Sequence, residues 1–341
     1  MLNFETYIDL PLVWSCILAF AIFLYVLLDG FDLGIGILFP FAPSDSCRNK
    51  MIDSIAPFWD GNETWLVLGG GGLFAVFPLA FATLMPALYV PIILMLMALV
   101  LRGVAFEFRF KVHTSLGRKI WDGAFHYGSL FAAFCQGIIL GTFVQGVKVV
   151  DNKFAGGILD WLTPFALMTG MALVCGYILL GANWLIYRTT DATQKWARKS
   201  SAYIAIYVLF FMGMVSLWTP FMNEMVYNRW FSYPNILYLA PVPALSMTLF
   251  IWHQYSVVRG GELLPFVLSI CLFGLNFLGL GISIWPFVVP YEIDIWQAAA
   301  APESQTFILI GAAFLLPLIL SYTAYSYYVF RGKVREEEFY H

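Results

Sequence analysis

Five charged side chains lie inside stretches of this sequence that otherwise consist of apolar residues. Asp29 and Asp32 stand in the first stretch, Asp60 and Glu63 in the second, and Arg102 in the third. A charge surrounded by hydrocarbon costs a few kcal/mol or more, so such groups are either paired or functional. Carboxylates whose ionisation is balanced by a nearby arginine can bind and release protons. The sequence therefore predicts either a proton-exchange site or a structural ion pair.

The spacing of these residues indicates that they meet. Each of the two acidic pairs is three residues apart, so its members share one face of a helix. At ~1.5 Å per residue, Asp29 and Arg102 both lie roughly 25 Å from the outer ends of their helices. We therefore expect a protonatable cluster at similar depth near the cytoplasmic side, with Glu107 at the rim. The alternative is an ion pair of Arg102 with Asp29 or Asp60 that only fixes the first three helices together.

Three further residues flank the second acidic pair. Trp59 and Trp65 stand on either side of it, and tryptophan near a helix end is usually an anchor at the membrane interface. Asn62 can donate and accept hydrogen bonds across helices. We expect these side chains to support the cluster or the packing around it.

The composition is that of an integral membrane protein. Hydrophobic residues make up 61% of the 341 residues and charged residues 11%, against about one quarter in ordinary globular chains. We expect one all-α transmembrane domain over residues 1–341, with a tight turn near Thr83 and Pro86 between the second and third helices. Nine apolar stretches are long enough to span a bilayer, at roughly 20 residues each: 11–39, 55–81, 83–110, 121–146, 160–187, 200–220, 234–258, 262–288 and 304–330.

The basic residues predict the orientation. Of the 18 Lys and Arg residues, 14 lie at the ends of the odd-numbered stretches or in the segments that follow them, the last being Arg335 in the tail. Three lie in the segments that follow even-numbered stretches, on the opposite side of the membrane. The positive-inside rule then places the N-terminus outside and the C-terminus in the cytoplasm. An odd number of spans agrees with this orientation.

Metal or haem ligation by this chain is not expected. A haem within the membrane needs axial ligands that face each other, and the four histidines, His113, His126, His253 and His341, are a poor set. The five cysteines show no metal-ligand spacing. There is no phosphate-binding loop, dinucleotide fingerprint or nucleophile constellation. We therefore assign no catalytic chemistry to the chain alone and expect no nucleic-acid partner.

Two other classes of membrane protein stay open on these residues. A proton-coupled transporter often has interrupted helices in both halves, and Gly69–Gly72 is a candidate for one such break. No matching break occurs in the second half. A scaffold in another respiratory assembly is the third class. The small-residue pair Gly30 and Gly34 is typical of close helix packing in lipid.

Several longer motifs carry a family resemblance. They are DGFDLG at 29–34, SIAPFWDGNETWL at 54–66 and LRGVAFEFR at 101–109, together with 285–299 and 322–333 near the end. These motifs resemble subunit II of the cytochrome bd-type terminal quinol oxidases, from the first helix to the tail. The resemblance implies nine transmembrane helices, arranged as two four-helix bundles plus a peripheral helix.

The resemblance also implies a role inside a larger complex. Subunit II of this family is haem-free and pairs with a larger subunit I, which carries haems b558, b595 and d and the quinol site. One or two single-helix small subunits often join. The complex lies in the bacterial cytoplasmic (inner) membrane, oxidises quinol and reduces dioxygen to water. It takes protons from the cytoplasm and so generates a proton-motive force without pumping.

Individual positions follow from the same resemblance. Asp60 matches a protonatable aspartate on a proton route toward the haems, and Trp65 matches a tryptophan on an oxygen route. Asp29 and Arg102 match buried charges around that region. Some members also hold a structural quinone, and the short outer loops resemble those of the cyanide-insensitive branch.

Overall fold

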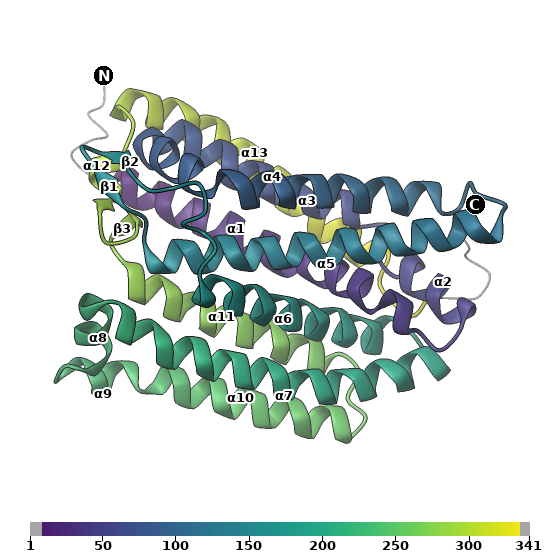
Figure 1. The fold of residues 1–341 in the computed structure, drawn as a ribbon. Coiled ribbons are helices and arrows are strands. Elements are labelled where there is room, and N and C mark those ends of the chain that lie inside the picture. The colour runs from purple at the N-terminus through teal and green to yellow at the C-terminus, as the bar shows by residue number, and fades with distance from the viewer. Residues whose placement is uncertain (1–8, 335–341) are drawn as a thin grey trace.

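Long helices packed side by side make up the molecule (Figure 1). The computed structural model describes residues 9–334, so Arg335 and His341 lie outside the described residues. The long helices are α1 (Leu10–Leu38), α3 (Trp59–Val76), α4 (Pro78–Phe108), α5 (Ser115–Gln145), α6 (Pro164–Arg188), α7 (Asp191–Met222), α10 (Pro241–Val258), α11 (Leu264–Ile284) and α13 (Pro302–Val329).

Short elements connect the long helices. They are the 3₁₀ turn η2 (Phe39–Phe41), the helices α2 (Asp45–Asp53), α8 (Glu224–Phe231), α9 (Asn235–Leu239) and α12 (Ile295–Ala298), and two antiparallel hairpins. The hairpins pair β1 (Val149–Val150) with β2 (Lys153–Phe154) and β3 (Phe287–Val289) with β4 (Ile293–Asp294). The chain is mostly helical, as expected, and these hairpins were not predicted because strands of two or three residues are too short to produce a sequence period.

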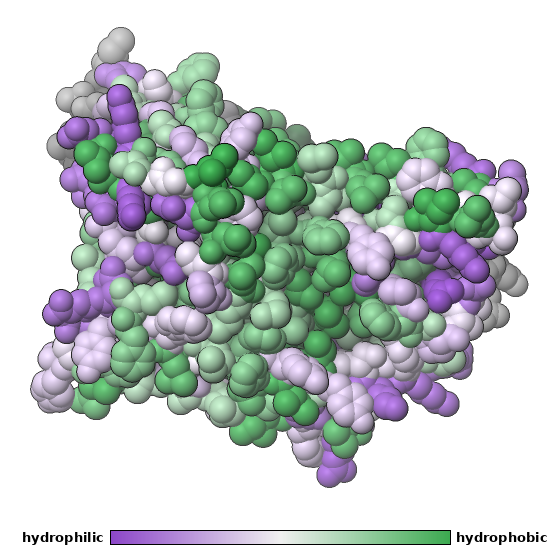
Figure 2. Space-filling model, in the orientation of Figure 1, coloured by the Kyte–Doolittle hydropathy of each residue, from purple (hydrophilic) through white to green (hydrophobic). Residues whose placement is uncertain are grey.

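Eight helices of the described residues are long and apolar enough to cross a membrane. Helix α3 has 18 residues and is not among these eight, because Asp60, Asn62, Glu63 and its glycines lower its hydropathy. Hydrophobic side chains cover the middle of the visible face, and hydrophilic ones gather at both ends of the helices (Figure 2). This surface suits a lipid environment. The prediction of a helical, multi-pass membrane protein is confirmed.

One predicted boundary is wrong. The turn between the second and third apolar stretches lies at Phe77, where the backbone leaves helical geometry, and not near Thr83 and Pro86. Helix α4 begins at Pro78 and continues through Pro86 and Pro91. Proline favours the first turn of a helix, and membrane helices tolerate internal prolines because neighbouring groups satisfy the freed carbonyls.

Helix α1 occupies the centre of the fold and is buried continuously from Asp29 to Leu38. It contacts α3, α5 and α6. A Cβ atom on Gly34 would lie 1.8 Å from the Tyr177 carbonyl oxygen of α6, and one on Gly30 would lie 2.7 Å from the Tyr177 ring. The predicted close packing at Gly30 and Gly34 is thus confirmed.

The described chain starts and finishes at opposite ends of the helices (Figure 1). At one end, the Trp14 indole N–H of α1 donates to the Gln305 carbonyl of α13 at 3.2 Å. At the other end, the Arg188 guanidinium of α6 donates to the Phe330 carbonyl that follows α13. These contacts attach α13 to the rest of the molecule at both of its ends.

Candidate functional site

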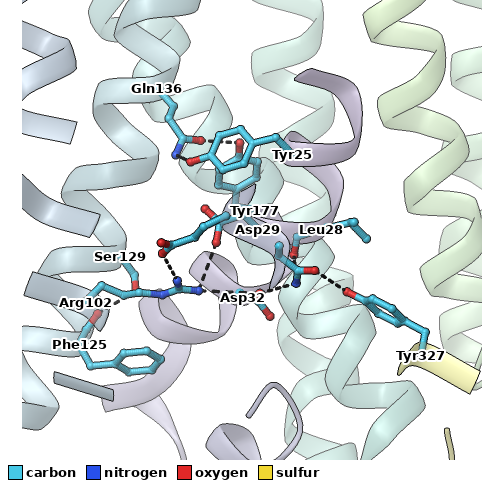
Figure 3. Close-up of polar contacts among 12 residues, drawn as sticks. Tyr25, Leu28, Asp29, Asp32, Arg102, Phe125, Ser129, Gln136, Tyr177 and Tyr327 are labelled. Atoms are coloured by element: carbon cyan, nitrogen blue, oxygen red, sulfur yellow. Dashed lines mark hydrogen bonds and ion pairs between the residues drawn. The ribbon is translucent and has the colours of Figure 1, made fainter. Parts of the chain in front are cut away.

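Arg102 lies at the centre of a buried cluster of charged side chains (Figure 3). Its Nη2 atom is 3.2 Å from Asp29 Oδ1 and 3.8 Å from Asp32 Oδ2. Its Nη1 atom is 2.6 Å from Glu63 Oε1. The side chains of Arg102 and Asp32 are 0% exposed and that of Asp29 is 1% exposed, whereas that of Glu63 is 31% exposed. One guanidinium thus faces three carboxylates, which we call the charge cluster.

Helix geometry and small residues bring the charge cluster together. Asp29 and Asp32 are three residues apart on α1 and so face the same way. Helix α4 approaches α5 closely at Gly128, where a Cβ atom would lie 2.9 Å from the Arg102 amide nitrogen. Trp59, at the start of α3, covers the guanidinium, with the Arg102 Cζ atom 5.3 Å from the indole centroid. This cation–π contact adds to the balance of charge around Arg102.

The charges in the charge cluster do not cancel if all four groups are ionised. The next arginine along the chain, Arg109, directly follows α4 and is bound elsewhere, because its Nε lies 2.6 Å from Asp122 Oδ1. Neighbouring carboxylates oppose each other's ionisation, and burial opposes it further. The single guanidinium of Arg102 can therefore balance one of the three negative charges and not all of them.

A second layer of hydrogen bonds extends the charge cluster to α13. The Asn62 amide donates to Asp32 Oδ2 at 2.7 Å and to the Leu28 carbonyl at 3.2 Å. The Tyr327 hydroxyl donates to Asn62 Oδ1 at 3.0 Å. Asn62 therefore holds the Asp32 carboxyl in place, and Tyr327 holds Asn62.

A third group of hydrogen-bonded side chains, on the other side of Asp29, was not predicted from the sequence. The Gln136 amide of α5 donates to the Tyr25 hydroxyl of α1 at 2.6 Å, and the Tyr177 hydroxyl of α6 donates to Gln136 Oε1 at 2.7 Å. All three side chains are buried. Gln136 is a polar residue in an apolar segment and therefore needs a partner. The sequence could therefore have indicated that Gln136 has a hydrogen-bond partner, although it does not identify that partner.

The remaining predicted residues lie outside the charge cluster. Asp60 is exposed on α3, one turn before Glu63, and makes no ion pair with Arg102 among the described residues. Of the two partners considered for Arg102, the structure therefore has Asp29, together with Asp32 and Glu63. Glu107 is exposed near the end of α4. Trp65 is buried and packs edge-on against Phe20, with ring centroids 6.4 Å apart.

These features define a class of protein: a multi-pass helical membrane protein with an arginine and several carboxylates held between its helices. The chain belongs to the family of cytochrome bd terminal oxidase subunit II, whose model matches residues 10–330. This match confirms the family resemblance read from the motifs.

Individual relatives match along almost their whole length. The chain is 28% identical to the cytochrome bd-I ubiquinol oxidase subunit 2 of Escherichia coli (strain K12), covering 99% of this chain and 98% of the relative. It is also 28% identical to the cytochrome bd ubiquinol oxidase subunit 2 of Bacillus subtilis (strain 168), covering 96% and 97%. The bd oxidase structure from Geobacillus thermodenitrificans contains a chain of the same fold, with a TM-score of 0.71, 19% identity and coverage of 95% and 99%.

Proposed function

We propose that this chain is the haem-free core subunit of a quinol:dioxygen oxidoreductase in the bacterial cytoplasmic membrane. In this role it supports a haem-bearing subunit I and contributes to proton uptake from the cytoplasm. Family membership supports the first part, because the relatives are named as subunits of ubiquinol oxidases. The observation that carries the second part is Arg102, fully buried and surrounded by three carboxylates.

The proposed topology has nine crossings, with α3 as the ninth. Helix contacts join α6 to α7 and α11, and α10 to α7 and α11, which favours one bundle of these four helices. The other bundle then consists of α1, α3, α4 and α5, with α13 peripheral. In the proposed orientation the basic connections face the cytoplasm, because positive residues are retained there.

The histidines of the described residues favour haems on the partner. His253 is buried and its Nε2 lies 3.0 Å from the Asn183 amide nitrogen. His126 packs edge-on against Phe41, with ring centroids 6.1 Å apart, and His113 is exposed. This set does not fit axial haem ligation, which needs two facing ligands or one with an open site. We therefore assign the haems to subunit I, where the family resemblance implies haems b558, b595 and d.

The proposed proton route enters the charge cluster through α3. Asp60 is exposed, and so are Gly61, Thr64, Gly70 and Gly71 on the same helix. A Cβ atom on Gly61, Gly70 or Gly71 would meet nothing within 4 Å in this chain. A surface of small residues lets another helix approach closely, so we assign this face to subunit I. A proton at Asp60 is then one helical turn from Glu63, which contacts Arg102.

Other finer features belong to the same proposal. Trp65, beside Phe20, is assigned to an oxygen route, following the family pattern. The most apolar stretch of α13 has no buried residue in this chain, so it is available to lipid or to a single-helix small subunit. A structural quinone in this subunit is carried over from the family alone.

The test is to purify the chain from cells that express its native partners and to record a reduced-minus-oxidised optical spectrum. Haem b and d bands, together with a larger copurified subunit, are expected. A haem-free preparation of the chain alone from the same cells would contradict the proposal. The chain reconstituted alone in vesicles should show no proton-coupled transport; such transport would support a transporter instead.

A further inference from the structure

A pocket of about 310 Å³, which we call the basic pocket, opens between the start of α7 and the end of α10. These two helices lie side by side (Figure 1). The Gln254 side-chain amide of α10 donates to the Ala202 carbonyl of α7 at 3.0 Å, which joins the helices at the pocket. The lining consists of Lys195, Arg198, Lys199 and Ala202 of α7 and Val257 and Val258 of α10.

The two lysines of the basic pocket carry positive charge that this chain does not balance. Lys199 follows Lys195 by four residues on α7, so both side chains share one helix face. Both are exposed, and neither forms an ion pair among the residues that the structure describes. Like charges at this spacing repel each other. An anion bound between the two lysines would therefore stabilise this part of α7.

Arg198 has a different role, because its guanidinium is bound to the end of α10. Its Nη1 atom donates to the Gly261 carbonyl at 2.8 Å and to the Val257 carbonyl at 3.2 Å. Carbonyls at the C-terminal end of a helix carry partial negative charge, which opposes the binding of an anion nearby. Arg198 offsets this charge and so removes the obstacle to an anion in the basic pocket.

Glu262, in the connection from α10 to α11, is an acid close to this end of α10, but its charge is already balanced. Its carboxylate accepts a hydrogen bond from the Gln194 amide at 3.0 Å and lies 3.1 Å from the Lys333 Nζ atom. The lysines of the basic pocket are therefore left to a ligand from outside the chain.

An exposed apolar surface continues from the basic pocket along both helices. Its members on α7 are Tyr203, Ile206 and Phe210, and those on α10 are Ile251, Trp252 and Tyr255. Both helices are long and apolar enough to cross a membrane, and tyrosine and tryptophan near the ends of such helices favour the membrane interface. A ligand that covers the whole surface needs an anionic group at one end and hydrocarbon at the other.

We propose that the basic pocket binds the phosphate of an anionic phospholipid, whose acyl chains lie along the exposed apolar faces of α7 and α10. Basic pockets between membrane helices bind anionic lipid headgroups in this way. A soluble anion would match the lysines but would leave the apolar part of the surface without a partner. The inference needs only that the chain lies in a membrane, and it is independent of the proposed role in proton uptake.

The test measures lipid binding by native mass spectrometry of the chain purified in mild detergent with its native partners. The probes are dioleoyl phosphatidylglycerol, which is anionic, and dioleoyl phosphatidylcholine, which has no net charge. The wild type should prefer phosphatidylglycerol. Lys195→Gln combined with Lys199→Gln should weaken phosphatidylglycerol binding by about thirtyfold, because two basic contacts are lost. Arg118→Gln combined with Lys119→Gln removes two exposed charges near the start of α5 and is the matched control.

A second pair of variants places the phosphate in the basic pocket itself. Val258 lines the pocket and is 81% exposed, so replacing it leaves the core intact. Val258→Glu puts a negative charge beside the phosphate and should weaken phosphatidylglycerol binding, whereas Val258→Gln should not.

Four results would overturn the inference. The first is a wild type that binds the two lipids equally, and the second is equal weakening in the two double variants, which would indicate diffuse surface charge. The third is displacement of phosphatidylglycerol by inorganic phosphate at concentrations similar to those of the lipid, which would indicate a site for soluble anions. The fourth is binding that occurs only after a copurified subunit is removed, which would assign the basic pocket to that subunit.

Discussion

The Glu63 Oε1 atom lies 2.6 Å from the Arg102 Nη1 atom and so joins the surface of α3 to the centre of the charge cluster. Arg102 is fully buried, whereas the Glu63 side chain is 31% exposed. Arg102 also contacts Asp29 and Asp32, so this ion pair links the buried acids of α1 to the exposed surface of α3.

Replacing Arg102 should prevent stable assembly. Arg102→Leu leaves the buried acids without their counter-charge, and removing one partner of a buried ion pair costs roughly 3–5 kcal/mol. We expect the amount of assembled complex, measured by haem absorbance per cell, to fall severely. Arg118→Leu changes an exposed arginine near the start of α5 and should leave assembly unaffected. Wild-type levels for Arg102→Leu would refute the pairing.

Replacing Gly34 should force α1 and α6 apart. A Cβ atom on Gly34 would lie 1.8 Å from the Tyr177 carbonyl oxygen, a main-chain atom that cannot rotate away. Gly34→Ala should therefore lower the thermal midpoint of the complex in detergent by several degrees and displace Asp32, two residues earlier. Gly213→Ala on α7, where a Cβ atom would meet nothing within 4 Å, is the matched control. Equal midpoints for the two variants would count against the close packing.

The pH dependence of stability should include a contribution from Asp53, at the end of α2. The residue is 8% exposed and its Oδ1 has no hydrogen-bond partner. Burial raises the pKa of the Asp53 carboxyl from 3.8 to about 6, against an opposing effect of Arg109. Between these values the folded protein binds a proton that the unfolded chain does not bind, so this contribution to stability is present below pH 3.8 and is lost as the pH rises through about 6.

Asp53→Asn tests this sign. The variant lacks the titrating group, so it should gain stability relative to wild type between about pH 4 and pH 7, by at most about 3 kcal/mol. Thermal midpoints of the complex at a series of pH values measure the difference. Asp151→Asn, at an exposed residue with a positive φ of 49° that asparagine also tolerates, should show no such trend. A constant difference between Asp53→Asn and wild type across this range would contradict the account.

Much of the fold followed from hydropathy alone, because membrane helices must be long and apolar. The boundary at Phe77 could not be predicted in this way. Pro86 resembles a helix stop in the sequence, but it lies inside α4 as an internal proline. The two hairpins were also missed because strands this short carry no repeating pattern.

The charge cluster was predictable in part. Asp29 and Arg102 are conspicuous because charge is rare in apolar segments. Asp60 and Glu63 share a helix face by spacing, yet only Glu63 reaches Arg102, since the rotation of α3 about its axis is set by tertiary packing. The contact of Gln136 with Tyr25 depends on how α5 approaches α1 and has no local signature.

The most direct test of the proposed proton-uptake role is the turnover of the complex that carries Asp60→Asn. The oxygen-consumption rate with excess quinol is compared with the reduced-minus-oxidised haem spectrum of the same preparation. The account predicts slowed turnover with an intact haem spectrum, because Asp60 delivers protons through Glu63 without holding any haem. Normal turnover with an intact spectrum would make Asp60 merely structural and would contradict the proposed route.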